Sequence, residues 1–209
     1  MVLVYTHKIT PRLTYIFKHI FIRILNSKVS FTTKIEEFVA FNGAKLNYSK
    51  MPLGNEFFIR SYDLLFEQGI NDIEFSIAKW DENVPCFFTA GKKSSIPYDI
   101  FAASFYLMSR YEEYLPHVQD EHERFSVEES MAFRNGFLKR PLVDIWAYKF
   151  LEVLKEKFPD HPFENREFSY ISTFDINQAY IYRAKGLVRS IGGFMIDFFT
   201  FKLSAFIDR

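Results

Sequence analysis

The residues best suited to chemistry lie near the end of the chain, where Asp175 and Asn177 follow the apolar run 168–174. We expect this run to be a buried strand that carries Asp175 to its exit. Strand exits are where α/β folds place catalytic and metal-binding side chains. A carboxylate there can act as a general base or bind a metal. The tripeptide Thr173-Phe-Asp is short, so an Asp that merely caps the turn after a strand is an open alternative.

A second polar set lies at the end of a predicted helix and in the loop that follows it. Arg110 and Glu113 are three residues apart, the spacing at which opposite charges meet on a helix. Glu112 and Glu113 are adjacent, so they cannot face the same way as an acid/base pair. We predict that Arg110, Glu113 and Arg124 share a polar face. Arg110, Glu112 and Glu113 could instead link the helix end to the following loop, through Arg124, and we favour this structural role over a binding surface.

Three further features have reactive residue types in unfavourable settings. One loop holds five residues of types that bind metals: His117, Asp120, Glu121, His122 and Glu123. Their spacing is not that of a ligand pair on a helix, so we favour a solvated loop over a metal site. The run 90–95 lacks the first glycine of a phosphate loop. Cys86 lies in an apolar run, where burial would raise its pKa, and we expect an inert core thiol.

Composition sets the broad class. The 209 residues are 48% hydrophobic and 25% charged, as in globular proteins, and 26 phenylalanines make a sizeable aromatic core available. The 26 basic and 26 acidic residues cancel, so charge gives no argument for nucleic acid or an acidic membrane surface. A single cysteine excludes an internal disulfide. The start lacks a signal-peptide pattern, and charges interrupt every apolar stretch, so we expect a cytoplasmic protein with no transmembrane segment.

The elements that must position these residues follow from local patterns. β-Branched and apolar runs predict strands; they lie at 2–6, 29–32, 38–41, 45–49, 56–60, 73–77 and 84–89. Thr10 and Pro11 suit the first two positions of a helix through about residue 25. Apolar residues at helical spacing predict helices over 95–114 and 144–157, and a shorter helix or turn over 34–38. Ser61 could cap another short helix through residue 67. The sequence therefore predicts an α/β fold: a mixed or parallel sheet with packed helices.

Two parts of the sequence resemble a known family. The string Ile171-Ser-Thr-Phe-Asp-Ile-Asn177 resembles the first motif of the polysaccharide deacetylases, the NodB-like carbohydrate esterases. That motif reads Thr-Phe/Tyr-Asp followed by a second Asp. The stretches 99–114, 122–125 and 140–141 resemble a domain found ahead of such a catalytic domain in bacterial proteins.

The resemblance implies a metal-dependent hydrolase that removes acetyl groups from N-acetylated sugars, built on a β/α barrel. Asp175 matches the general base. Asn177 occupies the position of the second Asp, which is a metal ligand in the family. The family takes two more ligands from a later His-x-x-x-His motif, and no histidine follows His161 in this sequence.

We therefore expect residues 1–165 to be an α/β accessory domain and residues 166–209 the first strand and helix of a truncated barrel. Whether the chain is an enzyme stays uncertain, and we expect it to be inactive by itself. No cofactor is expected here; a zinc-like divalent metal is expected only for the complete family domain. The alternative function is a non-enzymatic module that binds a glycan or a protein. The apolar tail 194–206 needs a partner surface, for which we favour the missing barrel over another chain or a membrane.

Overall fold

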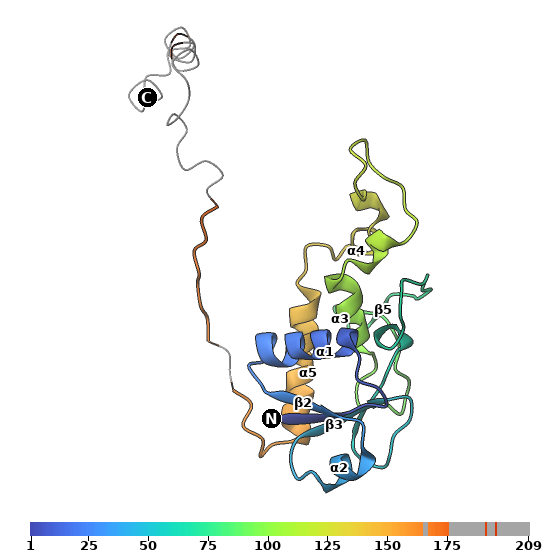
Figure 1. Cartoon of the computed structure of the whole chain (residues 1–209), viewed down its shortest axis with the longest axis vertical. Coiled ribbons are helices and arrows are strands. Elements are labelled where there is room, and N and C mark those ends of the chain that lie inside the picture. Colours follow the sequence, from blue (N-terminus) through green and yellow to red (C-terminus); the bar gives the residue numbers. More distant parts are fainter. Residues whose placement is uncertain (165–166, 176–190, 192–194, 196–209) are drawn as a thin grey trace. The chain divides into compact units, whose positions relative to one another are not determined.

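The computed structural model describes residues 1–164, 167–175, 191 and 195 (Figure 1). The chain divides into two units, Met1–Glu167 and Phe168–Arg209. The regular structure described below belongs to the first unit.

Four parallel strands form the main sheet, in the order β2-β1-β3-β4. They are β1 (Val2–Tyr5), β2 (Val29–Thr32), β3 (Lys45–Ser49) and β4 (Phe57–Arg60). Residues of β1 are buried along its whole length. Burial of a central strand on both faces is typical of parallel sheets, whose connecting helices cover each side. The expected α/β fold with a parallel sheet and packed helices is confirmed.

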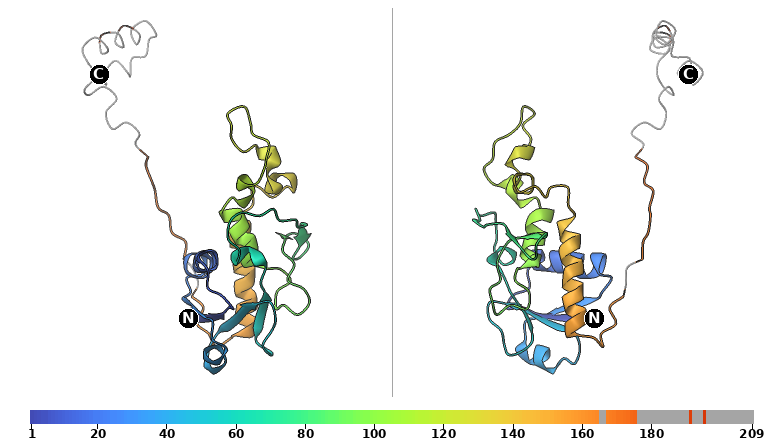
Figure 2. Two further views of the ribbon diagram at one scale, coloured as in Figure 1. Left: turned by 45° about the vertical axis from the view of Figure 1, so that its right-hand side comes forward. Right: turned by 180° about the vertical axis from the view of Figure 1, so that it is seen from behind.

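Helices cover both faces of this sheet (Figures 1 and 2). Because side chains alternate along a strand, Val2 and Val4 face one layer while Leu3 and Tyr5 face the other. Phe38 of α2 (Ile35–Ala40) packs against Leu3 and Tyr5. The opposite layer is larger and holds the main core; its helices are α1 (Pro11–Lys18), the π-helix η1 (His19–Ile24), α3 (Ile100–Met108) and α5 (Leu142–Lys157).

Aromatic rings dominate the main core. Phe17 of α1 stacks on Phe101 of α3 with ring centroids 3.8 Å apart, and Phe150 of α5 meets Phe101 edge-on at 5.5 Å. Edge-to-face pairs such as Phe101–Phe150 add to the free energy gained by burial. These rings fix the first turn of α3 between α1 and α5.

The short elements gather at the two ends of α3. The helix η2 (Asp63–Leu65) follows β4, and the antiparallel pair β5 (Ala78–Lys79) and β6 (Pro85–Cys86) precedes α3. Beyond α3 come three short helical segments: η3 (Tyr111–Tyr114), η4 (Val127–Glu129) and α4 (Met131–Arg134). In Figure 1 these three lie at the end of the first unit that is remote from the sheet.

The predicted helix over 95–114 is correct in place but wrong in length. It begins after Asp99, whose carboxylate accepts hydrogen bonds from the amides of Phe101 and Ala102. It ends at Met108, because Arg110 adopts a left-handed backbone conformation with φ of 52°. A left-handed residue cannot continue a right-handed helix, so the chain resumes as the separate turn η3.

Several predicted strands are also corrected. The run 38–41 lies mostly in α2, whose last carbonyls are satisfied when the Lys45 ammonium group donates to Phe38, Val39 and Phe41. Unpaired carbonyls at a helix end need such donors. The run 73–77 forms no strand, and 84–89 keeps only Pro85–Cys86. The predicted helix starting at Ser61 is reduced to η2, and Tyr62 rather than Ser61 precedes it.

The predicted buried strand over 168–174 is wrong for the described residues. Residues 167–175 have no regular structure, and Phe168, Ile171 and Phe174 are more than four-fifths exposed. A strand needs neighbours to take its backbone hydrogen bonds. The apolar run has no such neighbour in the described part of the chain, so local pattern alone does not make it a strand. The expected barrel start is not observed, and its helix lies outside the described residues.

Candidate functional site

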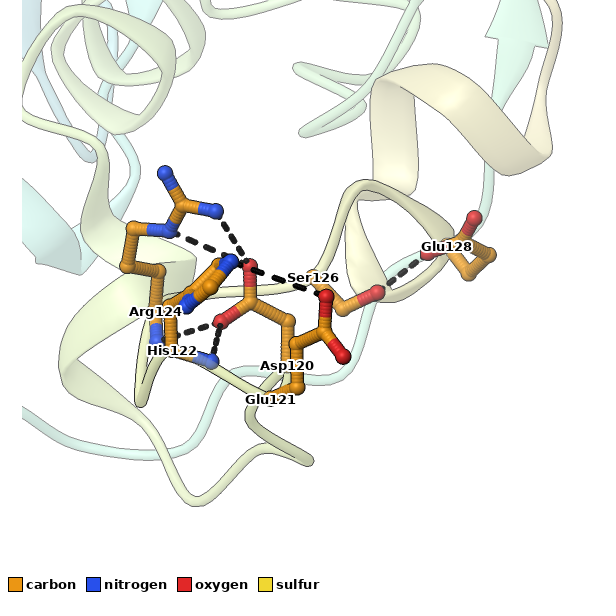
Figure 3. Close-up of polar contacts among 6 residues, drawn as sticks. All are labelled: Asp120, Glu121, His122, Arg124, Ser126 and Glu128. Carbon is orange, nitrogen blue, oxygen red and sulfur yellow. Dashed lines mark hydrogen bonds and ion pairs between the residues drawn. The ribbon is translucent and has the colours of Figure 1, made fainter.

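A tight turn after η3 is built around one carboxylate. Asp120 accepts hydrogen bonds from the amides of His122, at 2.8 Å, and Arg124, at 3.0 Å (Figure 3). The amide of Asp120 donates in return to the Arg124 carbonyl at 2.8 Å. Gln119 and Phe125 then face each other as an antiparallel bridge. Glu121, His122 and Glu123 are exposed, as expected of a solvated loop, and Asp120 closes this loop as a hairpin.

The same carboxylate orients the Arg124 side chain. The guanidinium group contacts Asp120 Oδ2 from Nε at 3.1 Å and from its terminal nitrogen at 3.0 Å. Hydrogen bonds from the Arg124 amide, the His122 amide and the guanidinium hold the pKa of Asp120 below its usual value. Asp120 is thus ionised at neutral pH, and its contacts with the turn leave it poorly suited to a metal.

Arg110 immediately precedes η3 and Glu113 lies within it, just beyond the end of α3. Arg110 Nε donates to Glu113 Oε1, so the predicted pair with a spacing of three residues is confirmed. Arg110 is one of four residues other than glycine with positive φ among the described residues. A positive backbone φ is uncommon in a residue with a long side chain, and backbone outliers of this kind concentrate at functional sites.

The three predicted binding residues come together around one hollow. Arg110, Glu113 and Arg124 all border a depression of about 610 Å³, which we call the polar hollow. Its lining comes from the start of η3, the hairpin and η4; the residues are Arg110, Glu113, Asp120, Arg124, Phe125, Ser126, Val127 and Glu128. Ser126 donates a hydrogen bond to Glu128, as Figure 3 shows. Arg110, Glu113 and Arg124 therefore border one concave polar surface.

Two further hollows adjoin the polar one, and Phe125 borders all three. A cavity of about 530 Å³, the apolar cavity, lies between α3, α4 and the start of α5. A hollow of about 470 Å³, the acidic hollow, carries four carboxylates; they belong to Asp72, Glu74, Glu112 and Glu129. His117 meets the Phe125 ring edge-on at 4.9 Å. Phe125 is thus the shared wall of the whole region.

Glu112 fixes the wall between the apolar cavity and the acidic hollow. Its carboxylate accepts hydrogen bonds from the Ser130 hydroxyl at 3.0 Å and the Met131 amide at 2.8 Å. Met131 begins α4, so Glu112 supplies the acceptor that the first turn of a helix needs. The sequence predicted that Glu112 helps to link the helix end to the following loop, and the structure identifies Ser130 and Met131 as its partners. Sequence reasoning missed the role of Phe125, because it depends on contacts across loops rather than on spacing.

The usual ligand position of such a sheet is filled by the chain itself. Parallel α/β sheets bind ligands beyond the carboxyl ends of the strands, at the point where strand order reverses, here between β1 and β3. The segment after β4 crosses this position. Leu64 and Leu65 are fully buried, Thr10 donates to the Leu65 carbonyl, and Phe66 packs on His7 with ring centroids 4.2 Å apart. The candidate site at the end of α3 is accordingly the better one.

Two buried ionisable side chains, Asp99 and Cys86, have a structural role rather than a chemical one. Asp99 accepts hydrogen bonds from four donors, including the Tyr48 hydroxyl at 2.6 Å and the Tyr62 amide at 2.7 Å, and burial still raises its pKa to about 6. Cys86 is buried, as expected, and burial raises its pKa to about 12, which keeps the thiol protonated.

The deacetylase-like residues do not join this site. Asp175 is exposed in the irregular segment 167–175, and Asn177 lies outside the described residues. Among residues 1–164, 167–175, 191 and 195, no group of three or more His, Cys, Asp or Glu side chains is placed to hold a metal ion. Within the same residues, no helix is long and apolar enough to cross a membrane.

Comparison with known proteins gives one match. A model described as a family of unknown function, DUF7033, matches residues 2–159, which fall within the first unit. No curated protein and no solved structure matches the chain.

Proposed function

The chain belongs to DUF7033, a family of unknown function. From the chemistry of the polar hollow, we propose that its first unit is a non-catalytic glycan-binding module. In the longer arrangement that the sequence resemblance implies, this module is the accessory domain of an N-acetyl-glycan deacetylase. The catalytic domain of that protein would use a zinc-like divalent metal, and the module itself needs no cofactor.

The observation that carries the proposal is the pairing of charges around the polar hollow. Arg110 is paired with Glu113 and Arg124 with Asp120, so each donor lies beside an acceptor. A sugar presents the same arrangement, because neighbouring hydroxyl groups both donate and accept. A phosphate or a nucleic acid would need an excess of positive charge, whereas this hollow has two guanidinium groups against three carboxylates.

Phe125 supplies the apolar contact that a sugar ring also needs. Pyranose rings carry C–H groups on their faces, and these suit the electron-rich face of an aromatic ring. Phe125 is half-buried and its ring is held by His117. Sites for small molecules usually combine an apolar surface with a few polar groups that orient the ligand.

The deacetylase association rests on the sequence rather than on the hollow. Asp175 matches the family's general base, and Asn177 stands at the position of a metal ligand. The stretches 99–114 and 122–125 that resemble the accessory domain contribute Arg110, Glu113 and Arg124 to the hollow. A module that holds a polymer next to a hydrolase raises the local substrate concentration by tethering.

Glycan binding is tested by titrating the 209-residue chain with oligomers of N-acetylglucosamine in a calorimeter. We expect saturable binding that Arg124→Gln weakens about tenfold or more, since a hydrogen bond to a charged group is worth ~1.5–3 kcal/mol. The control is Arg23→Gln, because Arg23 is exposed on η1 and borders none of the three hollows. Absence of binding, or equal weakening by both variants, would refute the proposal.

Catalysis is tested separately by measuring acetate release from the same oligomers with and without added zinc. We expect no turnover by this chain, because the resemblance assigns it only Asp175 and Asn177 of the catalytic set. Zinc-dependent turnover that Asp175→Asn abolishes would show that the chain is an enzyme and overturn the non-catalytic part of the proposal.

A further inference from the structure

We propose that the glycan bound in the polar hollow carries an apolar substituent, an acyl or alkyl chain, which occupies the apolar cavity. This inference rests on the proposed glycan binding and names the class of ligand more closely: an amphiphilic saccharide rather than a bare one. The two hollows would then form one composite site.

The first support is that the two hollows share walls. Arg110, Glu113, Phe125 and Val127 border both the polar hollow and the apolar cavity. A ligand seated over Phe125 therefore reaches either side without leaving the protein surface. The lining residues change at Phe125 from mostly polar in the polar hollow to mostly apolar in the apolar cavity. A sugar suits the first side and a hydrocarbon chain the second.

The second support is the chemistry of the apolar cavity. Its walls are side chains of α3, the loop after α4 and the start of α5; they include Leu107, Met108, Phe137, Leu138, Leu142 and Val143. The volume of about 530 Å³ lies in the range of sites that bind small molecules. Water gains little in an apolar hollow, whereas a hydrocarbon chain gains free energy with each methylene group buried.

The third support is that polar groups at the rim already have protein partners. Glu112 accepts from Ser130 and Met131, and the Arg140 guanidinium donates to the Asn83 carbonyl at 2.6 Å. Most of the remaining lining is apolar, which favours a hydrocarbon over a second sugar.

The test is a calorimetric titration of the 209-residue chain with N-acetylglucosamine glycosides that carry hexyl to decyl chains, all below their micelle concentrations. A buried methylene contributes ~0.8 kcal/mol, so we expect affinity to rise about fourfold per methylene until the cavity is filled, and then to level off. Sugar-free alcohols of the same length should bind more weakly than the glycosides.

A matched pair of variants locates the chain. Leu138 borders the apolar cavity but not the polar hollow and is 49% exposed, so Leu138→Asp should leave the fold intact. We expect it to remove the dependence on chain length and to leave binding of the bare oligomer unchanged. Leu53→Asp is the control, since Leu53 is 42% exposed and lies outside the three hollows; it should keep the fourfold steps.

The outcomes separate this inference from the proposed function. Bare oligomers that bind, together with glycosides whose affinity does not depend on chain length, would overturn the inference and leave glycan binding standing. Alcohols that bind as tightly as the glycosides would overturn both. Chain-length dependence that persists in Leu138→Asp would show that the chain binds elsewhere, which also overturns the inference.

Discussion

At the scale of single residues, Arg110 combines an unfavourable backbone with a place at the candidate site. Its φ of 52° and ψ of 45° lie in the left-handed region, which costs a residue with a Cβ about 1–2 kcal/mol. Glycine adopts this region without that cost. A residue that keeps such a conformation beside a hollow is a functional candidate. The free energy that this conformation costs can be measured.

We expect Arg110→Gly to be more stable to urea than Arg110→Ala, by about 1 kcal/mol. Both variants lose the exposed ion pair with Glu113, so their difference isolates the backbone. Both should also bind N-acetylglucosamine oligomers more weakly than the unchanged chain. Equal unfolding free energies would mean that the left-handed geometry stores no strain.

Asp99 gives a second prediction at this scale, on pH. Its pKa is about 6 in the folded protein, against ~3.9 for an unfolded Asp. Between these values the folded state binds more protons than the unfolded state, so stability falls as pH rises from about 4 to about 6. The two-unit difference corresponds to a loss of ~3 kcal/mol at most, and above pH 6 the contribution stays constant.

The measurement is urea unfolding of the chain and of Asp99→Asn between pH 4 and pH 7. Subtracting the variant removes the contributions of other carboxyl groups, and the difference should decline with rising pH over this window. Parallel curves would show that Asp99 does not titrate there, and that its four hydrogen-bond donors outweigh the effect of burial.

At the scale of elements, the hairpin over 119–125 depends on Asp120. One oxygen of its carboxylate takes two backbone amides and the other takes the Arg124 guanidinium. The hairpin thus carries Arg124 and Phe125 into the polar hollow. Its order comes from hydrogen bonds within a short stretch rather than from an apolar core, so single substitutions should act locally.

We expect Asp120→Asn to keep the turn, because the amide oxygen still accepts from His122 and Arg124, and to lose only the ion pair. Asp120→Ala removes both functions and should open the hairpin. Hydrogen exchange at the His122 and Arg124 amides should therefore speed up in the alanine variant and change little in the asparagine variant. Equal protection in the two variants would contradict this account of the turn.

At the scale of the whole molecule, the first unit has its own core. Its sheet is covered by helices on both faces, and it contains the large buried side chains of Phe17, Phe101, Trp146 and Phe150. A domain of this size with a continuous core is expected to fold cooperatively without further sequence.

We expect residues 1–167 alone to unfold in one cooperative thermal transition, with a melting temperature within a few degrees of that of the whole chain. A change of 1 kcal/mol in stability shifts the melting temperature of a domain this size by ~2–4 °C. Circular dichroism at two wavelengths checks the result. A broad transition would indicate that the core needs residues beyond 167.

The sequence by itself determined the elements whose signals are local. Thr10 accepts from the Leu13 amide and Pro11 begins α1, as their residue types predicted, and β2 spans the predicted residues. Arg110 and Glu113 meet because their spacing suffices. The α/β class also followed, with a sheet that the sequence left open as mixed or parallel.

Only the tertiary structure decided where the predicted helix at 95–114 stops and what surrounds its end. Arg110 turns left-handed, Glu112 reaches across to α4, and Phe125 joins three hollows, all through contacts that no spacing rule contains. The apolar run 168–174 gives the opposite case. Its pattern suits a strand, but a strand needs partners for its backbone hydrogen bonds, and pattern alone cannot supply them.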